Sequence, residues 1–391
     1  MTTITQTAIG NDGIHTLLPR EQMIAPARKL RDIYAITPGA PIVHREFGYF
    51  CLERWYGEGL ERGDNLAEVF GYDPPGDYDI GDLGWCEAAF CPTFDKIVLE
   101  TRGEHEVIQD PQGRSLLVFT GRRTGFMPTF LDHPVKDMAT WEEKCAWRMR
   151  ADTPERWNGF DEKMASARAA AGEGKVIVQR IGAGCMYLRS LFGPEEIMYA
   201  FHDQPELIHA CMKTWFELAD AVTARHQEHV TFDMVFLAED ICYNHGLLWS
   251  PATIKEFLFP YYQQLLANIR RRQLDQSRHL YVQVDSDGYA VEAIPLFREA
   301  VRMDVMSPFE VASGCDVVAI GRDYPFLAIS GGIDKRVLAQ GKHEIDRMVE
   351  RIIPAMRERG GYYPTCDHGV PEEVSLDNYR HYRTRCIELG G

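Results

Sequence analysis

The sequence is short of basic residues: 42 Lys and Arg stand against 58 Asp and Glu, which gives a formal net charge of −16. So acidic a chain repels the phosphate backbone of nucleic acids and anionic lipid surfaces. We therefore expect neither a nucleic acid nor a membrane as a partner. Long apolar runs are also missing, and without a run of about 18 apolar residues no transmembrane helix is expected.

Other absences bear on location and cofactor. Residues 1–12 lack the basic and apolar regions of a signal peptide. The ten cysteines are scattered singly, with no Cys-x-x-Cys pair, which is typical of reduced thiols. The run from Arg180 to Gly184 lacks the third glycine of a dinucleotide-binding fingerprint, so a Rossmann fold is rejected. We expect a cytoplasmic protein.

From about residue 175 onward, short β-rich runs alternate with stretches that have helical spacing. One of the helical stretches begins with Ser250-Pro251, with Ser250 as the helix cap and Pro251 as the first helical residue. Such an alternation is typical of a parallel sheet covered by helices. The predicted strands, including one early run, cover residues 41–45, 175–181, 233–238, 279–284, 303–306, 326–330 and 361–364. Chains of this length commonly form one barrel. We predict a single α/β domain over residues 1–391, a (β/α)₈ TIM barrel with one strand unrecognised.

Residues 50–150 do not follow this alternation. The runs 97–100, 104–108 and 115–119 look like an antiparallel meander, and Asp110-Pro-Gln-Gly113 is good β-turn chemistry between the last two. Insertions on the C-terminal face of a barrel shape the substrate pocket. We therefore interpret residues 50–150 as an insertion after the first strand that forms a lid over the barrel mouth.

Polar residues gather at the predicted strand ends, where barrels carry their chemistry. In chain order they are His44, Arg45, Glu46, Glu239, Asp240, His245, Asp285, Asp287, Ser307, Glu310, Asp334, Cys366, Asp367 and His368. Any single carboxylate has an ordinary explanation as a helix N-cap. That explanation is strongest for Asp240, Asp334 and Ser307.

Asp285 and Asp287 are less easily explained that way. Alternate residues of a strand point to the same side, and two carboxylates there repel each other unless a proton, a cation or a basic ligand lies between them. Cys366 alone would be a packing residue. With His368 beside it and the aspartates opposite, it would instead complete a site for Zn²⁺ or another divalent metal. Both explanations of Cys366 stay open.

Several blocks follow one another along the chain: Phe192-Gly-Pro-Glu195, Glu239-Asp-Ile-Cys-Tyr-Asn-His-Gly246, Gly331-Gly-Ile-Asp-Lys335 and Asp367-His-Gly-Val-Pro371. In this order they resemble the uroporphyrinogen-decarboxylase superfamily, whose fold is a (β/α)₈ barrel. The resemblance spans about residues 40–390. It agrees with the alternation of strands and helices.

The decarboxylases of that superfamily bind a substrate with many carboxylates through an Arg-rich N-terminal motif. The corresponding stretch here, His44-Arg-Glu-Phe-Gly48, keeps one Arg and gains an acid. A pocket for many carboxylates is unattractive in so acidic a chain. His368 is nevertheless similar to the late active-site His of these enzymes. A cofactor-free decarboxylase or lyase acting on a small acid or a tetrapyrrole is therefore the alternative function.

The other branch comprises methyltransferases that use a corrinoid protein and a thiol or folate. The resemblance implies a Zn²⁺ held by a His-x-Cys pair and a later Cys. Asp285-x-Asp287 falls where the pair would be, and Cys366 falls near the later Cys. An oxygen-rich site favours harder cations and suits thiolate activation less well.

We expect a methyltransferase that moves a methyl group between a small methylated substrate and a corrinoid protein or folate. The residues expected to take part are Asp285, Asp287 and Cys366 as metal ligands, Glu239, Glu310 and His368 in acid–base catalysis, and His44, Arg45, Asp240 and His245 in substrate binding. Zn²⁺ or another divalent metal is the expected ion, and a corrinoid or tetrahydrofolate the methyl carrier. A corrinoid protein and a second copy in a homodimer are the expected partners. A non-catalytic subunit that binds a corrinoid or tetrapyrrole is a further alternative.

Overall fold

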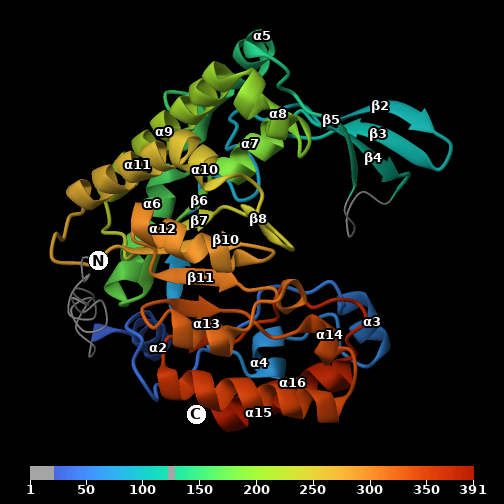
Figure 1. Ribbon diagram of the computed structural model, residues 1–391, viewed down its shortest axis with the longest axis vertical. Helices are drawn as coiled ribbons and strands as arrows, with labels where there is room; N and C mark the ends of the chain where they lie inside the picture. Colours follow the sequence, from blue (N-terminus) through green and yellow to red (C-terminus); the bar gives the residue numbers. More distant parts are fainter. Residues whose placement is uncertain (1–21, 122–127) are drawn as a thin grey trace.

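The structure, a computed structural model, describes residues 22–121 and 128–391 (Figure 1). The segment 1–12, in which no signal peptide was recognised, lies outside these residues. The centre is a seven-stranded parallel sheet in the order β1-β6-β7-β10-β11-β12-β13. Its strands are β1 (Asp77–Asp79), β6 (Val176–Gly182), β7 (Met234–Ala238), β10 (Tyr281–Ser286), β11 (Val305–Pro308), β12 (Ala328–Ser330) and β13 (Tyr362–Tyr363). Each strand predicted from residue 175 onward is confirmed.

The first predicted strand, residues 41–45, is not a strand in the structure. Its backbone groups bond elsewhere: the Ile42 N–H donates to the Gly390 carbonyl at 3.2 Å, and the His44 N–H donates to the Asp73 carboxylate at 2.7 Å. The edge position of the sheet belongs instead to β1. Because β1 lies within residues 50–150, the predicted boundaries of the insertion are wrong, and part of that segment builds the barrel.

Residues 41–46 nevertheless fill the gap between the two edge strands. The Arg45 guanidinium pairs with Asp77 of β1 at 3.0 Å and lies 4.8 Å from the ring centroid of Tyr363 in β13. Backbone pairing resumes further along, between Tyr49 and Val370. One side chain reaches both edges, so the sheet curls round on itself.

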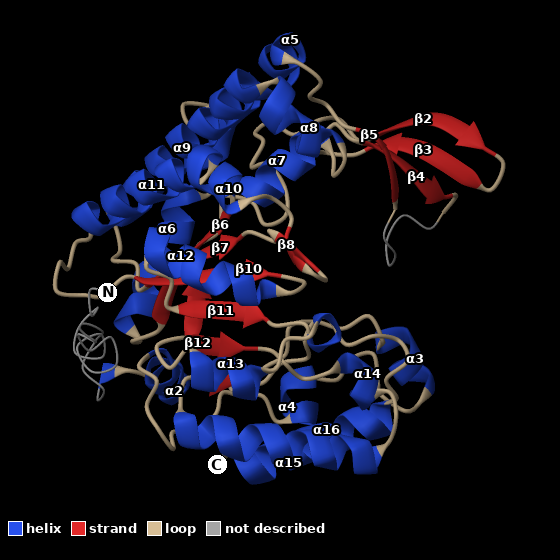
Figure 2. Cartoon of the chain, viewed as in Figure 1, coloured by secondary structure: helices blue, strands red, loops and turns tan. Residues whose placement is uncertain are grey.

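Four antiparallel strands form a separate sheet in the order β2-β3-β4-β5. They are β2 (Ile97–Arg102), β3 (His105–Gln109), β4 (Ser115–Phe119) and β5 (Thr129–Asp132). The turn before β4 is held by Asp110, whose side chain accepts from the backbone N–H groups of Gln112 and Arg114. The sheet stands away from the barrel as an arm, on the side toward which the arrows of β10 and β11 point (Figure 2). That this arm serves as a lid stays a prediction.

Helices cover the outside of the sheet. The longer ones are α6 (Phe160–Gly172), α7 (Gly184–Phe192), α8 (Glu196–Asp203), α9 (Pro205–Gln227), α11 (Phe259–Arg272), α12 (Ala293–Val301), α15 (Lys342–Arg359) and α16 (Leu376–Gly390). The shorter ones are α3 (Leu52–Gly57), α4 (Leu66–Phe70), α5 (Met138–Thr140), α10 (Pro251–Phe257), α13 (Val317–Asp323) and α14 (Lys335–Leu338), and a small hairpin joins β8 (Cys242–Tyr243) to β9 (Gly246–Leu247). Ser250 caps α10 by accepting from the Thr253 N–H, as its sequence predicts.

The N-terminal end of the barrel is closed by α2 (Ala25–Tyr34) (Figure 1). Apolar residues of α2 pack in one cluster with Val176, Val178, Met234, Tyr281, Val305 and Ala328 from the strands. Ile177 belongs to the larger cluster under the helices. Because neighbouring strand residues point to opposite faces, this division separates a barrel interior from a helix-facing core.

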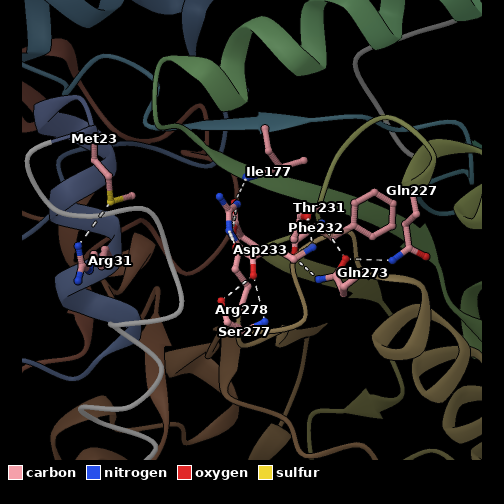
Figure 3. A network of polar contacts seen from close by, with 11 residues as sticks. Met23, Arg31, Ile177, Gln227, Thr231, Phe232, Asp233, Gln273, Ser277 and Arg278 are labelled. Carbon is pink, nitrogen blue, oxygen red and sulfur yellow. Dashed lines mark hydrogen bonds and ion pairs between the residues drawn. The ribbon is translucent and has the colours of Figure 1, made fainter.

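Polar contacts tie the strand starts together at this closed end (Figure 3). The Asp233 carboxylate accepts the Ile177 N–H at 2.8 Å and pairs with Arg278 at 3.2 Å. The Gln273 side chain accepts from the Gln227 amide and from the Phe232 N–H, both at 3.0 Å. These buried groups find partners inside the protein, as buried polar groups usually do, and the opposite end is left for a site.

All ten cysteines are free thiols. Within residues 22–121 and 128–391, no helix has both the length and the apolar character needed to cross a membrane.

Candidate active site

The barrel interior holds a cavity of about 490 Å³ toward the C-terminal ends of the strands. It is lined by residues from most strands of the barrel: Arg45, Glu46, Phe47, Trp85, Arg180, Phe236, Gln283, Asp285, Ser307, Pro308, Ser330, Tyr363 and Thr365. A smaller space of about 190 Å³ shares several of these residues and reaches down to Tyr34 of α2. Cavities of this size and position hold small molecules in barrel enzymes.

Two Arg–Asp pairs bring charge into these cavities. Arg45 pairs with Asp77 at 3.0 Å, and Arg180 pairs with Asp79 at 2.7 Å. Both aspartates lie on β1 with one residue between them, so they point to the same side of the strand. The Nε atoms of both arginines are buried and have no hydrogen-bond partner. Each pair therefore places one arginine and one aspartate at the same space.

Aromatic rings frame the same cavity. The Arg180 guanidinium lies 4.9 Å from the centroid of Trp85, and Trp85 stacks on Phe236 with ring centroids 5.3 Å apart. Arg45 lies over Tyr363 in the same manner. Cation–π contacts of this kind hold a guanidinium in place and shield it from water. The cavity wall is thus mixed, with aromatic rings beside polar and charged side chains.

Asp285 is the carboxylic acid on the β10 wall of the cavity. The Ser307 hydroxyl donates to its Oδ2, and the Gln283 amide donates to the Ser307 Oγ at 2.9 Å. Burial raises the pKa of Asp285 to about 7, against the hydrogen bond from Ser307, which lowers it. Near neutral pH this group therefore exchanges protons readily, which is what a general acid or base requires.

Asp287 lies beyond the end of β10, at the mouth. Burial, together with the nearby carboxylates of Asp240, Asp285 and Glu310, raises its pKa to about 8. The His368 Nε2 lies 3.8 Å from the Asp287 Oδ2. Burial lowers the pKa of His368, and its ring stacks against Phe50 at a centroid distance of 5.9 Å.

Glu310 has partners at the same mouth. Its Oε2 accepts the Gly288 N–H at 3.0 Å, and its Oε1 accepts the Lys335 ammonium at 3.1 Å. Asp367 is buried close by, where it accepts the backbone N–H groups of Val311 and Lys335 at 2.9 and 3.2 Å. These contacts join the loops after β11, β12 and β13, so part of this charge has a structural role.

Other predicted site residues do not line the cavity. Glu239 is fully buried in the helix layer, where the Tyr262 hydroxyl contacts both of its oxygens at 2.9 and 2.8 Å, and burial raises its pKa to about 8. His44 is buried beside Gly390 of α16. Asp240 forms an ion pair with Arg189 of α7, and His245 is exposed in the β8–β9 hairpin.

The metal ligands inferred from the sequence are not brought together. Cys366 is fully buried, its N–H donates to the Glu46 Oε1 at 2.8 Å, and burial raises the pKa of its thiol far above the usual range. Asp285 is engaged by Ser307. In the part of the chain that the structure describes, no three His, Cys, Asp or Glu side chains gather closely enough to hold an ion. The residues present do not fit the zinc site of the methyltransferase branch.

Sequence reasoning missed Arg180, Asp77, Asp79 and Trp85. β1 reads Asp-Tyr-Asp, so the residues that face the cavity are polar and give no apolar run to recognise. Arg180 lies inside a strand that was identified, in the segment rejected as a nucleotide motif. The signal that finds it is its position: residues of β6 alternate between the helix layer and the interior, and Val178 and Arg180 share the interior side.

A family model and one solved structure agree with this architecture. Residues 131–388 match the family model described as uroporphyrinogen decarboxylase (URO-D). A methyltransferase from Methanosarcina mazei has a similar structure, with a TM-score of 0.56 and 12% identity over 93% of this chain and 98% of the other. A putative vitamin-B12-independent methionine synthase from Listeria monocytogenes gives a TM-score of 0.31 and 14% identity, covering 58% of this chain and 69% of its own. Curated protein sequences give no significant match. Since the family model spans more than half of a chain that folds as a curled parallel sheet around a polar cavity, the protein belongs to the uroporphyrinogen decarboxylase (URO-D) family.

Proposed function

We propose that this protein is a methyltransferase that moves a methyl group between a small methylated substrate in the barrel cavity and a corrinoid protein or folate. The observation that carries the proposal is Asp285 on the cavity wall, oriented by Ser307 and with a pKa of about 7. Membership of a family that contains enzymes supports catalysis. The fold of the M. mazei methyltransferase supports the branch.

The chemistry follows from what a methyl group leaves behind. When it departs from an oxygen or nitrogen atom, that atom keeps the bonding electron pair and needs a proton. Protonated Asp285 supplies this proton and becomes a carboxylate that the Ser307 hydroxyl stabilises. Arg45 and Arg180 hold the polar part of the substrate, while the rings of Trp85 and Phe236 exclude water. A corrinoid or folate, when bound, supplies the methyl acceptor.

The test is methyl transfer from a panel of small O-methyl and N-methyl compounds to reduced cobalamin or to tetrahydrofolate, followed by absorbance and by mass spectrometry of the products. Asp285→Asn should lower kcat by about 10²- to 10⁴-fold, the range for loss of a general acid. Asp323→Asn, which changes an exposed aspartate paired with Arg322, serves as the matched control and should keep the wild-type rate. Wild-type turnover by Asp285→Asn would rule out its role.

A second candidate is a cofactor-free decarboxylase or lyase acting on a small acid. The guanidinium groups of Arg45 and Arg180 on the cavity wall favour it, because a carboxylate is the natural ligand for guanidinium donors. A tetrapyrrole with many carboxylates would be bound less well, since both arginines already have aspartate partners. Release of CO₂ from a small acid, with no methyl transfer from any compound of the panel, would select this function.

A further inference from the structure

A second carboxylic acid, Glu46, lines the cavity on the side of the barrel opposite to Asp285. Asp285 lies on β10, in the middle of the sheet, whereas Glu46 lies in the segment that joins its two edges. The Glu46 Oε1 accepts the N–H groups of Phe47 at 2.9 Å and Cys366 at 2.8 Å. Its Oε2 accepts the Tyr379 hydroxyl at 2.7 Å. A ligand in the cavity therefore lies between two acids.

The Tyr379 hydroxyl is the first of three in series. It contacts the Tyr72 hydroxyl at 2.5 Å, and Tyr72 in turn contacts the Tyr49 hydroxyl. In both contacts either oxygen can be the donor. Tyr379 is fully buried, whereas Tyr49 and Tyr72 are partly exposed. The hydroxyls thus form a continuous hydrogen-bonded series from Glu46 to two partly exposed tyrosines.

A buried cation lies beside this path. Arg383 of α16 is 2% exposed, and its guanidinium lies 4.7 Å from the ring centroid of Tyr72. Its two terminal nitrogens have no hydrogen-bond partner. A positive charge there favours negative charge on the neighbouring oxygens, which makes transient loss of a proton from a tyrosine or from Glu46 less costly.

The remaining groups that face Glu46 do not compete for its proton. Burial raises the pKa of Glu46 itself, so that its neutral form is accessible. The facing titratable groups other than the tyrosine series and Arg383 are the thiols of Cys51, Cys366 and Cys386 and the phenols of Tyr362 and Tyr382. Burial raises the pKa of every one of these, so all stay neutral near pH 7.

A purely structural role does not explain the series. The backbone N–H groups of Phe47 and Cys366 already fix the Glu46 carboxylate. Tyr281 and Tyr382, which are also buried, keep hydroxyls without any hydrogen-bond partner. A run of three hydrogen-bonded hydroxyls that ends at a cavity acid is therefore more than is needed to hold that acid in place.

We propose that Glu46 exchanges a proton with the ligand in the cavity and that the hydroxyls of Tyr379, Tyr72 and Tyr49 carry this proton between Glu46 and the solvent. When Glu46 has given its proton to the ligand, Tyr379 donates to the Glu46 Oε2, Tyr72 to Tyr379, Tyr49 to Tyr72, and water to Tyr49. One proton enters at Tyr49 and one leaves at Glu46, and the tyrosines end as they began. Glu46 is the catalytic residue, and the tyrosines are positioning residues. The inference rests on the proposed function only in taking this cavity as the active site.

The role of Glu46 is tested without any substrate, by infrared titration of protonated carboxyl groups in the full-length protein. Glu46→Gln should remove one titrating carboxyl signal. Tyr379→Phe should move the midpoint of that signal up by about 1 to 2 pH units, because the carboxylate loses a hydroxyl donor. Tyr382→Phe is the matched control: its ring contacts Tyr379 at 5.6 Å, but its hydroxyl has no partner, so the midpoint should not move. If the midpoint of the carboxyl titration is unchanged in Tyr379→Phe, Tyr379 is not coupled to Glu46. This result can be obtained even where Glu46→Gln does not fold.

The path is tested in turnover. The double variant Tyr49→Phe/Tyr72→Phe leaves the contact between Tyr379 and Glu46 in place but removes both hydroxyls beyond it. It should lower kcat at least tenfold and leave KM unchanged. In the plot of kcat against pH, the limb that reflects titration of Glu46 should become flatter. Tyr382→Phe should keep the wild-type values. Wild-type kcat in the double variant refutes the path. Because the infrared midpoints need no methyl donor, failure of the methyl-transfer proposal and failure of the Glu46 assignment remain distinguishable.

Discussion

At the scale of single residues, His44 shows how burial can turn a predicted binding group into a determinant of acid stability. It lies against α16, and burial lowers its pKa to about 4, with the positive charge of Arg383 as the next cause. The unfolded chain binds a proton at His44 near pH 6.5, whereas the folded protein resists it. Stability is therefore complete above about pH 6.5 and falls as the pH drops toward 4.

We predict that wild-type protein loses about 2 kcal/mol of unfolding free energy from this group between pH 7 and pH 5. His44→Asn should lose correspondingly less over the same interval, because it has no proton to gain on unfolding. Urea unfolding at the two pH values measures the difference. An equal loss in wild type and variant would place the acid sensitivity elsewhere.

The position of each residue in its strand explains which parts of the site could be predicted from the sequence. Arg45 and Asp285 were recognised from their place after β-rich runs, and both line the cavity. Glu239 follows a strand equally well, yet it faces the helices and bonds to Tyr262. The deciding factor is the side of the strand on which a residue falls. That side depends on the residue at which β7 ends, and a single sequence does not define strand ends so closely.

At the scale of elements, the strands of the second half were predictable because strands covered on both faces read as apolar runs. β1 escaped recognition because it has three residues, two of them aspartates that face the cavity. The run 41–45 looks like a strand by composition. Its N–H groups instead meet Gly390 and Asp73, both far from it in the chain, and no local pattern reveals such partners.

The helix α2 is the element that closes the barrel, and its contribution can be measured. Leu30 is 2% exposed and packs among the interior residues of the strands. Leu30→Ala should lower the unfolding free energy by about 2–5 kcal/mol, since it leaves a cavity in a packed cluster. Leu274, which is 60% exposed, is the control, and its replacement by Ala should change stability by less than about 0.5 kcal/mol. If urea unfolding shows equal changes in unfolding free energy for the two substitutions, α2 does not pack against the barrel interior.

At the scale of the whole molecule, the barrel is joined at one place by side chains. Arg45 and Asp77 meet there with side chains that are 32% and 27% exposed. A double-mutant cycle with Arg45→Gln and Asp77→Asn should give a coupling energy of about 1 kcal/mol, at the upper end for partly exposed pairs. The pair of Arg62 and Glu53, exposed at the surface, should show no measurable coupling. If the coupling energy between Arg45 and Asp77 is no larger than that of this control, the ion pair does not stabilise the join between the two edges of the sheet.

The way the barrel is joined has a consequence for the bore of the cavity. Elsewhere its circumference is fixed by backbone hydrogen bonds between neighbouring strands, but beside Arg45 and Glu46 it depends on an ion pair, a stacked guanidinium and a carboxylate. Such contacts can be exchanged one side chain at a time, without shifting the register of any strand. Substitution of a few side chains at this join can therefore change the width of the cavity, so that one fold can bind ligands of different size.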